Sequence, residues 1–194
     1  MSNFQRISVL GWLTLLFLVS QLNQVAYAEY YSAGNSRSVQ RSGLQVQRFK
    51  GGSTDSGTQG LMLGFRTSKY FYKGFSMGLE VVAGAPEDGS IVDNNILYTG
   101  MTLGWDQAFF KILTYEFNVF LGYGYGSSNN LGVSGDGFTI QPQAGLGFVL
   151  VNGYRVTFMP GYLYMPRTNG FSGFTFSLRF DRKSEAAPSK PVNE

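Results

Sequence analysis

The stretch LTYEFNVFLGYGYG, residues 113–126, shows the pattern from which the fold can be inferred, because its side chains change character at every second position. Odd-numbered positions carry Leu, Tyr, Phe and Val, whereas even-numbered positions carry Thr, Glu, Asn, one Phe and then Gly. Successive side chains of a β-strand point to opposite faces of the sheet, so this period of two predicts a strand. One face of that strand is large and apolar, and the other is small or polar.

The same alternation recurs along the chain, with clusters of turn-forming residues between the segments. Pro142 and Pro160 fall inside two of these segments, and each removes a backbone donor from the ladder. We therefore expect a bulge or a strand end at each proline. The segments that alternate clearly are 60–66, 75–84, 97–106, 113–126, 138–150, 154–164 and 173–180.

An eighth strand is expected at Val39–Lys50, where the pattern is weaker. Leu44 and Val46 alternate, but Phe49 is out of phase with them. A bulge near residues 47–48 would restore the phase, because a bulge adds one residue to one strand of a pair. The fold class predicted is all-β, an eight-stranded antiparallel up-and-down barrel.

The composition excludes several classes of function. The chain has no Cys and no His, which removes disulfides, thiol nucleophiles and the commonest general base and zinc ligand. We expect no cofactor and no metal. Charged residues make up only 14% of the chain, and the net charge of +3 is spread along it, so we expect no nucleic-acid partner.

Residues 1–28 have the features of a cleavable secretory signal peptide. Arg6 precedes the apolar run Val9–Ser20, which is too short for an ordinary membrane-spanning helix. Ala26-Tyr27-Ala28 fits the small-x-small cleavage rule, so we expect Sec export and cleavage after Ala28. The expected order is a signal peptide at 1–28, a short lead at 29–37, the barrel at 38–182 and a disordered periplasmic tail at 183–194.

Two features indicate that the barrel spans a membrane. The lumen of an eight-stranded barrel is barely wide enough for side chains, so the many large aromatics must face outward, as they do in lipid. The connections also alternate in length, as in outer-membrane barrels with long outer loops and short periplasmic turns. The long ones are 51–58, 85–95, 127–137 and 166–170, and the short ones are 70–73, 106–111 and 152–153. The aromatics expected to form a periplasmic girdle are Tyr70, Tyr72, Phe109, Phe110 and Tyr154.

In this architecture, and in segments such as LGYGYG (121–126) and GLGF (145–148), the chain resembles the small eight-stranded outer-membrane barrels of the OmpX, Ail and OmpA membrane-domain type. The aromatic-ended segment Phe174–Phe180 resembles the final strand that the barrel assembly machinery recognises. The resemblance implies location in the bacterial outer membrane, in contact with its lipid and lipopolysaccharide. Many members end on the last aromatic residue, whereas this chain continues to Glu194.

The expected lumen contains six charged side chains, which need partners because an unpaired buried ion is costly. We interpret them as a network of salt bridges and hydrogen bonds that fills the barrel. The alternatives are a gated path for small ions and a catalytic carboxylate pair formed by Glu80 and Glu116. The six residues are Arg66, Glu80, Asp106, Glu116, Arg155 and Arg179.

Three basic residues, Arg48, Lys50 and Arg167, are expected near the outer rim. There they could pair with lipopolysaccharide phosphates, and the alternative is simple solvation.

The predicted function is a non-enzymatic, monomeric membrane scaffold whose outer loops serve surface interaction or envelope integrity, with an extracellular ligand that the sequence does not identify. The alternatives are a narrow channel and a soluble periplasmic lipid-binding barrel. Known outer-membrane enzymes of similar size rely on a histidine, and this chain has none.

Overall fold

The structure is a computed structural model that describes residues 39–51, 59–71, 74–86, 94–110, 112–128, 133–167 and 171–185. The expected signal peptide and N-terminal lead lie outside the described residues, as does the tail beyond residue 185. Among the described residues, no helix is long and apolar enough to cross a membrane.

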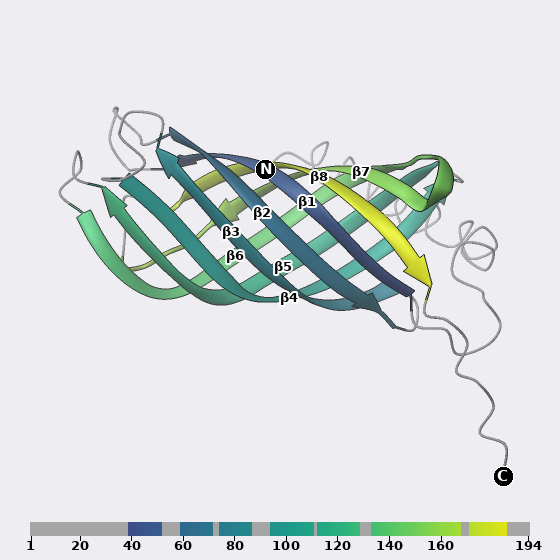
Figure 1. Cartoon of the computed structure of the whole chain (residues 1–194), viewed down its shortest axis with the longest axis horizontal. Coiled ribbons are helices and arrows are strands. Elements are labelled where there is room, and N and C mark those ends of the chain that lie inside the picture. Colours follow the sequence, from purple (N-terminus) through teal and green to yellow (C-terminus); the bar gives the residue numbers. More distant parts are fainter. Residues whose placement is uncertain are drawn as a thin grey trace, which may run out of the picture.

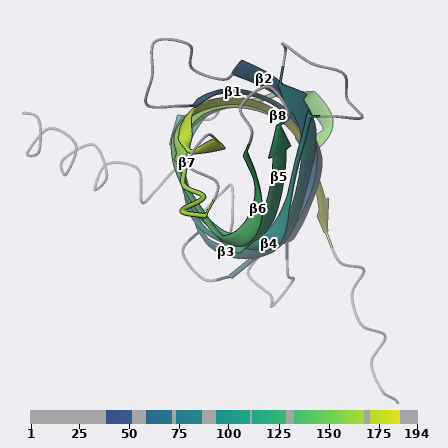
Figure 2. The same cartoon turned by 90° about the vertical axis from the view of Figure 1, so that its left-hand side faces the viewer.

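The eight strands form one closed antiparallel barrel in which every strand pairs with its neighbours in sequence (Figure 1). The first and last strands also pair with each other from Val39–Glu185 to Gly51–Gly173, which closes the ring seen end-on in Figure 2. The elements are β1 (Val39–Gly51), β2 (Gln59–Tyr70), β3 (Phe75–Pro86), β4 (Asn94–Phe110), β5 (Leu113–Ser128), β6 (Val133–Val149), the short 3-10 turn η2 (Val151–Gly153), β7 (Tyr154–Leu163) and β8 (Gly173–Glu185).

The large apolar side chains face outward. On β5, Phe117 and Tyr123 are 51% and 53% exposed, whereas Glu116, which points into the lumen, is 1% exposed. The other strands show the same alternation between exposed and buried positions. A soluble lipid-binding barrel requires the opposite arrangement, so the fold is the inside-out barrel of a membrane protein.

The expected bulge in β1 is wrong. The register of β1 with β2 runs without interruption from Val39 to Lys50, and its register with β8 is also continuous. Phe49 lies out of phase with Leu44 because it points into the lumen, where it is fully buried. An apolar lumen residue therefore caused the break in the pattern.

Several connections also differ from expectation. The third long connection, expected at 127–137, is shorter and spans residues 129–132, because β5 and β6 pair as far as Ser128 and Val133. Tyr70 is not part of a periplasmic girdle, since it is inward and 5% exposed. Phe110 and Tyr154 are exposed at that end, Phe109 is half-buried, and Tyr72 lies outside the described residues. The last strand continues to Glu185, past the expected barrel end at 182.

Neither proline ends its strand or causes a bulge. Pro142 keeps its register with Val119 of β5, and Pro160 keeps its register with Phe176 of β8. At the prolines the ladder is interrupted on the side between β6 and β7, where pairing stops at Gln143–Gly161 and resumes at Leu146–Phe158. The two prolines therefore affect one seam of the wall.

The outward face gives a direct test of the membrane setting. Leu79 in β3 is 62% exposed, a position at which a soluble barrel would accept a charge. In lipid, Leu79→Arg should lower the free energy of unfolding by about 2–4 kcal/mol, since a charge near the bilayer midplane is poorly solvated. Urea unfolding in lipid vesicles measures this, with Leu79→Phe as the control. An unchanged midpoint for Leu79→Arg would contradict the membrane assignment.

Candidate functional site

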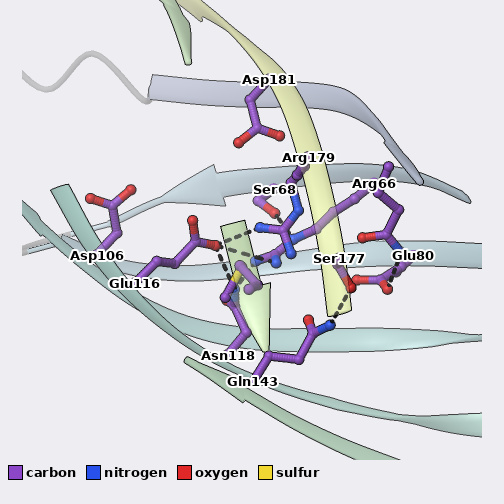
Figure 3. Close-up of polar contacts among 12 residues, drawn as sticks. Arg66, Ser68, Glu80, Asp106, Glu116, Asn118, Gln143, Ser177, Arg179 and Asp181 are labelled. Carbon is purple, nitrogen blue, oxygen red and sulfur yellow. Dashed lines mark hydrogen bonds and ion pairs between the residues drawn. The ribbon is translucent and has the colours of Figure 1, made fainter. Parts of the chain in front are cut away.

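The candidate site is the lumen, and its lower half, toward the short connections, is organised around Glu116 of β5. The Glu116 carboxylate accepts a hydrogen bond of 2.7 Å from Arg179 and one of 2.8 Å from Arg155. It also forms an ion pair of 3.4 Å with Arg66. All four side chains are at most 3% exposed. Figure 3 shows Arg66 and Arg179 beside the Glu116 carboxylate. One carboxylate thus joins strands β2, β5, β7 and β8 across the lumen.

Arg155 of β7 is the second centre of the network. Its guanidinium bonds to Glu116, forms a 2.9 Å ion pair with Asp181 of β8, and pairs with Asp106 of β4. Its Nη2 also lies 3.5 Å from the hydroxyl of Tyr70. Guanidinium groups suit such sites because their planar forks donate to several acceptors at once. Arg155 therefore ties the lower ends of β4, β5, β7 and β8 together.

Arg66 of β2 is held in place by two neutral partners. Its Nε donates to Ser68 Oγ and its Nη2 donates to Asn118 Oδ1, each over 2.8 Å. Gly104 of β4 makes the room, since a Cβ there would lie 2.2 Å from Asn118 Oδ1 and 2.6 Å from Ser76 Oγ. The glycine-rich inner face thus provides volume for the charged side chains.

Five of the six lumen residues expected from the sequence contact one another: Arg66, Asp106, Glu116, Arg155 and Arg179. Glu80 is buried but separate, and its Oε1 accepts a 2.7 Å bond from Gln45 Nε2. Glu80 and Glu116 therefore do not form a carboxylate pair. Within the described ranges, no group of three or more Asp, Glu, His or Cys residues could hold a metal ion.

Sequence reasoning missed four members of this half: Arg41, Tyr70, Asn118 and Asp181. Asp181 follows the last aromatic residue of β8 and looked like the start of a polar tail, yet it is 4% exposed and pairs with Arg155. Asp181 is two residues from Arg179 on the same strand, so both side chains point to the inner face. Arg41 lies over the Tyr70 ring at 5.5 Å from its centroid.

A layer of uncharged polar side chains lies above the charges. The Tyr98 hydroxyl lies within hydrogen-bonding distance of the side-chain oxygens of Gln47 and Gln141, at 3.2 and 3.0 Å. Ser177 links Gln47 to Gln143 through bonds of 3.0 and 3.1 Å. These bonds connect β1, β4, β6 and β8 across the middle of the barrel.

The half of the lumen nearest the long connections is apolar, which the sequence pattern did not predict. Phe171, from the β7–β8 connection, is fully buried and stacks on Phe49 with ring centroids 6.2 Å apart. Phe120 packs edge-on against Tyr98 at 5.0 Å. This outer cluster comprises Phe49, Met62, Val82, Ile96, Tyr98, Phe120, Leu163, Met165 and Phe171.

The three expected rim residues do not form one group. Arg48 and Lys50 are exposed on β1, and Arg48 Nη2 donates to Gln59 over 2.9 Å. Arg167 lies in the β7–β8 connection, with its aliphatic stem beside Gly137 of β6. Strands β1 and β6 are not neighbours in the barrel, so Arg167 lies apart from the other two.

No known protein family and no curated protein sequence matches the chain. Solved structures do: Neisserial surface protein A has a TM-score of 0.60 at 9% identity, over 74% of this chain and 95% of that one. Ail, the attachment invasion locus protein of Yersinia pestis, gives 0.49 at 17% identity, over 76% and 98%. The outer membrane enzyme PagL gives 0.42 at 12% identity, again over 76% and 98%.

The chain therefore has the fold of the small eight-stranded outer-membrane β-barrels. This confirms the resemblance expected from the sequence, at the level of fold. At these identities the likeness covers architecture, and activity must be argued from the residues of this chain.

The lumen contacts predict unequal roles for the two buried glutamates. Glu116→Gln should cost about 3–5 kcal/mol of stability, because it leaves buried arginines without their carboxylate. Glu80→Gln should cost clearly less, since the Glu80 carboxylate accepts its described hydrogen bond from a neutral glutamine amide. Urea unfolding in vesicles compares the two variants. Equal losses would contradict the central role of Glu116.

Proposed function

We propose that this protein is a non-enzymatic scaffold of the bacterial outer membrane. In this proposal it is exported by its signal peptide, cleaved after Ala28 and inserted as a monomer. Its outer connections and outer rim interact with surface molecules or strengthen the envelope. The observation that carries the proposal is the filled lumen, which leaves the outer surface as the part available to partners.

The filling argues against a channel because a charge network occupies one end of the lumen and an apolar cluster the other. Ions entering from the short-connection end meet the arginines and carboxylates around Glu116. Toward the other end, they meet the buried apolar cluster that contains the stacked rings of Phe49 and Phe171. An ion would have to pass both an ordered charge network and an apolar layer, and the apolar layer offers it no hydration.

The same contacts argue against catalysis in the lumen. The chain contains no His or Cys, so an acid–base or nucleophilic centre would have to use a carboxylate, Tyr, Ser, Thr or Lys. Glu116 is engaged by arginines and is 1% exposed, which leaves it neither free to accept a proton nor reachable by a substrate. No described pair in the lumen joins a nucleophile to an available base.

For the outer rim we propose contact with lipopolysaccharide phosphates. Arg48 and Lys50 support it by presenting two exposed cations side by side on one strand near the long connections. Arg167 offers a third cation above a different part of the wall. Arginine suits phosphate because its guanidinium can donate two parallel hydrogen bonds.

Planar-bilayer recording tests the scaffold against the channel. The purified, refolded barrel should show no discrete conductance steps, because both layers of the lumen are filled. A trimeric porin inserted in the same bilayers controls for the assay, and a gel-mobility shift on boiling verifies folding. Reproducible steps from the folded barrel would overturn the proposal in favour of a channel.

Replacing the rim cations tests the lipopolysaccharide contact. The triple variant Arg48→Gln, Lys50→Gln and Arg167→Gln should lower binding to lipopolysaccharide-containing vesicles several-fold, with a weaker dependence on salt. The matched control is Lys69→Gln, Arg182→Gln and Lys183→Gln, which removes three cations near the opposite end of the barrel. Equal binding by both triple variants would show that the outer rim has no special role.

A further inference from the structure

The seam between β6 and β7 lacks part of its backbone ladder. Ile140 and Tyr164 exchange both of their backbone bonds, at 3.0 and 2.8 Å. Hydrogen-bonded pairs alternate along an antiparallel ladder, so the next two fall at residues 142 with 162 and 144 with 160. Pro142 occupies the first of these pairs and Pro160 the second.

Each proline deprives one carbonyl of its ladder donor. Without an N–H on Pro142, the carbonyl of Tyr162 loses its donor, and Pro160 does the same to the carbonyl of Ala144. The ladders on the other side of each proline are unaffected, since the β5–β6 register continues past Pro142 and the β7–β8 register continues past Pro160. Two acceptors without ladder donors thus lie within a few residues of each other, on one seam.

A hollow of about 470 Å³ lies on the outer surface at this seam. Its floor contains small or cyclic side chains, and its walls are large apolar ones. The residues that matter are Pro142, Ala144 and Pro160 in the floor, and Phe117, Tyr162 and Phe174 around it. The hollow is therefore apolar except for the backbone between β6 and β7.

The surroundings identify what fills it. The hollow is continuous with the exposed apolar face that contacts membrane lipid, because Phe117, Tyr162 and Phe174 belong to both. Lipid provides no water for the two carbonyls, and an acceptor without a donor is costly there. An occupant must combine hydrocarbon for the hollow with an O–H or N–H donor for the seam.

We propose that this hollow binds the acyl chain of a membrane lipid that carries a hydroxyl or amide N–H near its head. The chain lies across Ala144 between Phe117 and Tyr162, and the donor group bonds to a carbonyl of the seam. A second copy of the protein fits less well. Two convex barrels meeting at one hollow would bury far less than the roughly 1,200 Å² typical of stable pairs.

Photo-crosslinking in vesicles tests the proposal. The full-length mature protein is placed in phosphatidylcholine vesicles containing a small fraction of one of two probes. One probe is an N-acyl sphingolipid with a diazirine in its amide-linked chain, and the other is a diacyl ester lipid with the same diazirine chain. The amide probe should label peptides from β6 and β7 about fivefold more than the ester probe, which is the size of one net hydrogen bond.

Two pairs of variants separate the parts of the site. Ala144→Phe should abolish the labelling of β6 and β7 by filling the hollow. Ala83→Phe, also outward-facing but on β3, should leave it unchanged. Pro142→Ala with Pro160→Ala restores both ladder donors and should make the two probes label equally. Pro166→Ala, in the β7–β8 connection, should preserve the preference.

Labelling spread evenly around the barrel, or unchanged in Ala144→Phe, would overturn the site. A crosslink between two copies at this seam would overturn the lipid as its occupant. Equal labelling by the two probes in the unaltered protein would overturn the role of the donor group. The scaffold proposal does not depend on these results, because its test is the absence of conductance.

Discussion

A lipid bilayer offers no hydrogen-bond partner to a backbone N–H or C=O group, which constrains every spanning segment. A sheet can meet this constraint only by closing on itself, and here β1 pairs with β8 along its whole length. Closure with eight strands fixes a narrow lumen. The lumen side chains must then fill that space, so the content of the barrel follows from the requirement to close it.

The buried charges balance within this narrow space. Among the described residues, the buried charged side chains are four arginines (Arg41, Arg66, Arg155 and Arg179) and four carboxylates (Glu80, Asp106, Glu116 and Asp181). They lie on seven of the eight strands. The ion pairs around Glu116 and Arg155 join β2, β4, β5, β7 and β8, several of which share no ladder. A balanced network avoids the cost of an isolated buried ion, although it stabilises less than an apolar core of the same volume would. Its value is to specify one arrangement of the strands.

The strands and their facing could be predicted from the sequence because both follow from a period of two. The period of two also assigns Arg66, Glu116 and Arg179 to the inner face. It contains no information about which side chains meet across the lumen. It did not distinguish Glu116, which binds arginines, from Glu80, which binds Gln45. Phe49 was misread because an apolar residue on the inner face looks like a shift of phase. Asp181 was misread because a charge after the last aromatic residue resembles the start of a tail.

The β6–β7 seam is where the closing constraint is met least completely. A proline in a strand is usually tolerated at an edge, where its missing donor faces solvent, but a closed barrel has no edge. Here both prolines turn their missing donors toward the same seam, so the defect is confined to one place. Had one of them been shifted by a single residue, its missing donor would have faced another strand pair and weakened a second seam. Concentrating both defects spares the neighbouring β5–β6 and β7–β8 seams, and it gives the outer wall a position at which two backbone acceptors lack ladder donors.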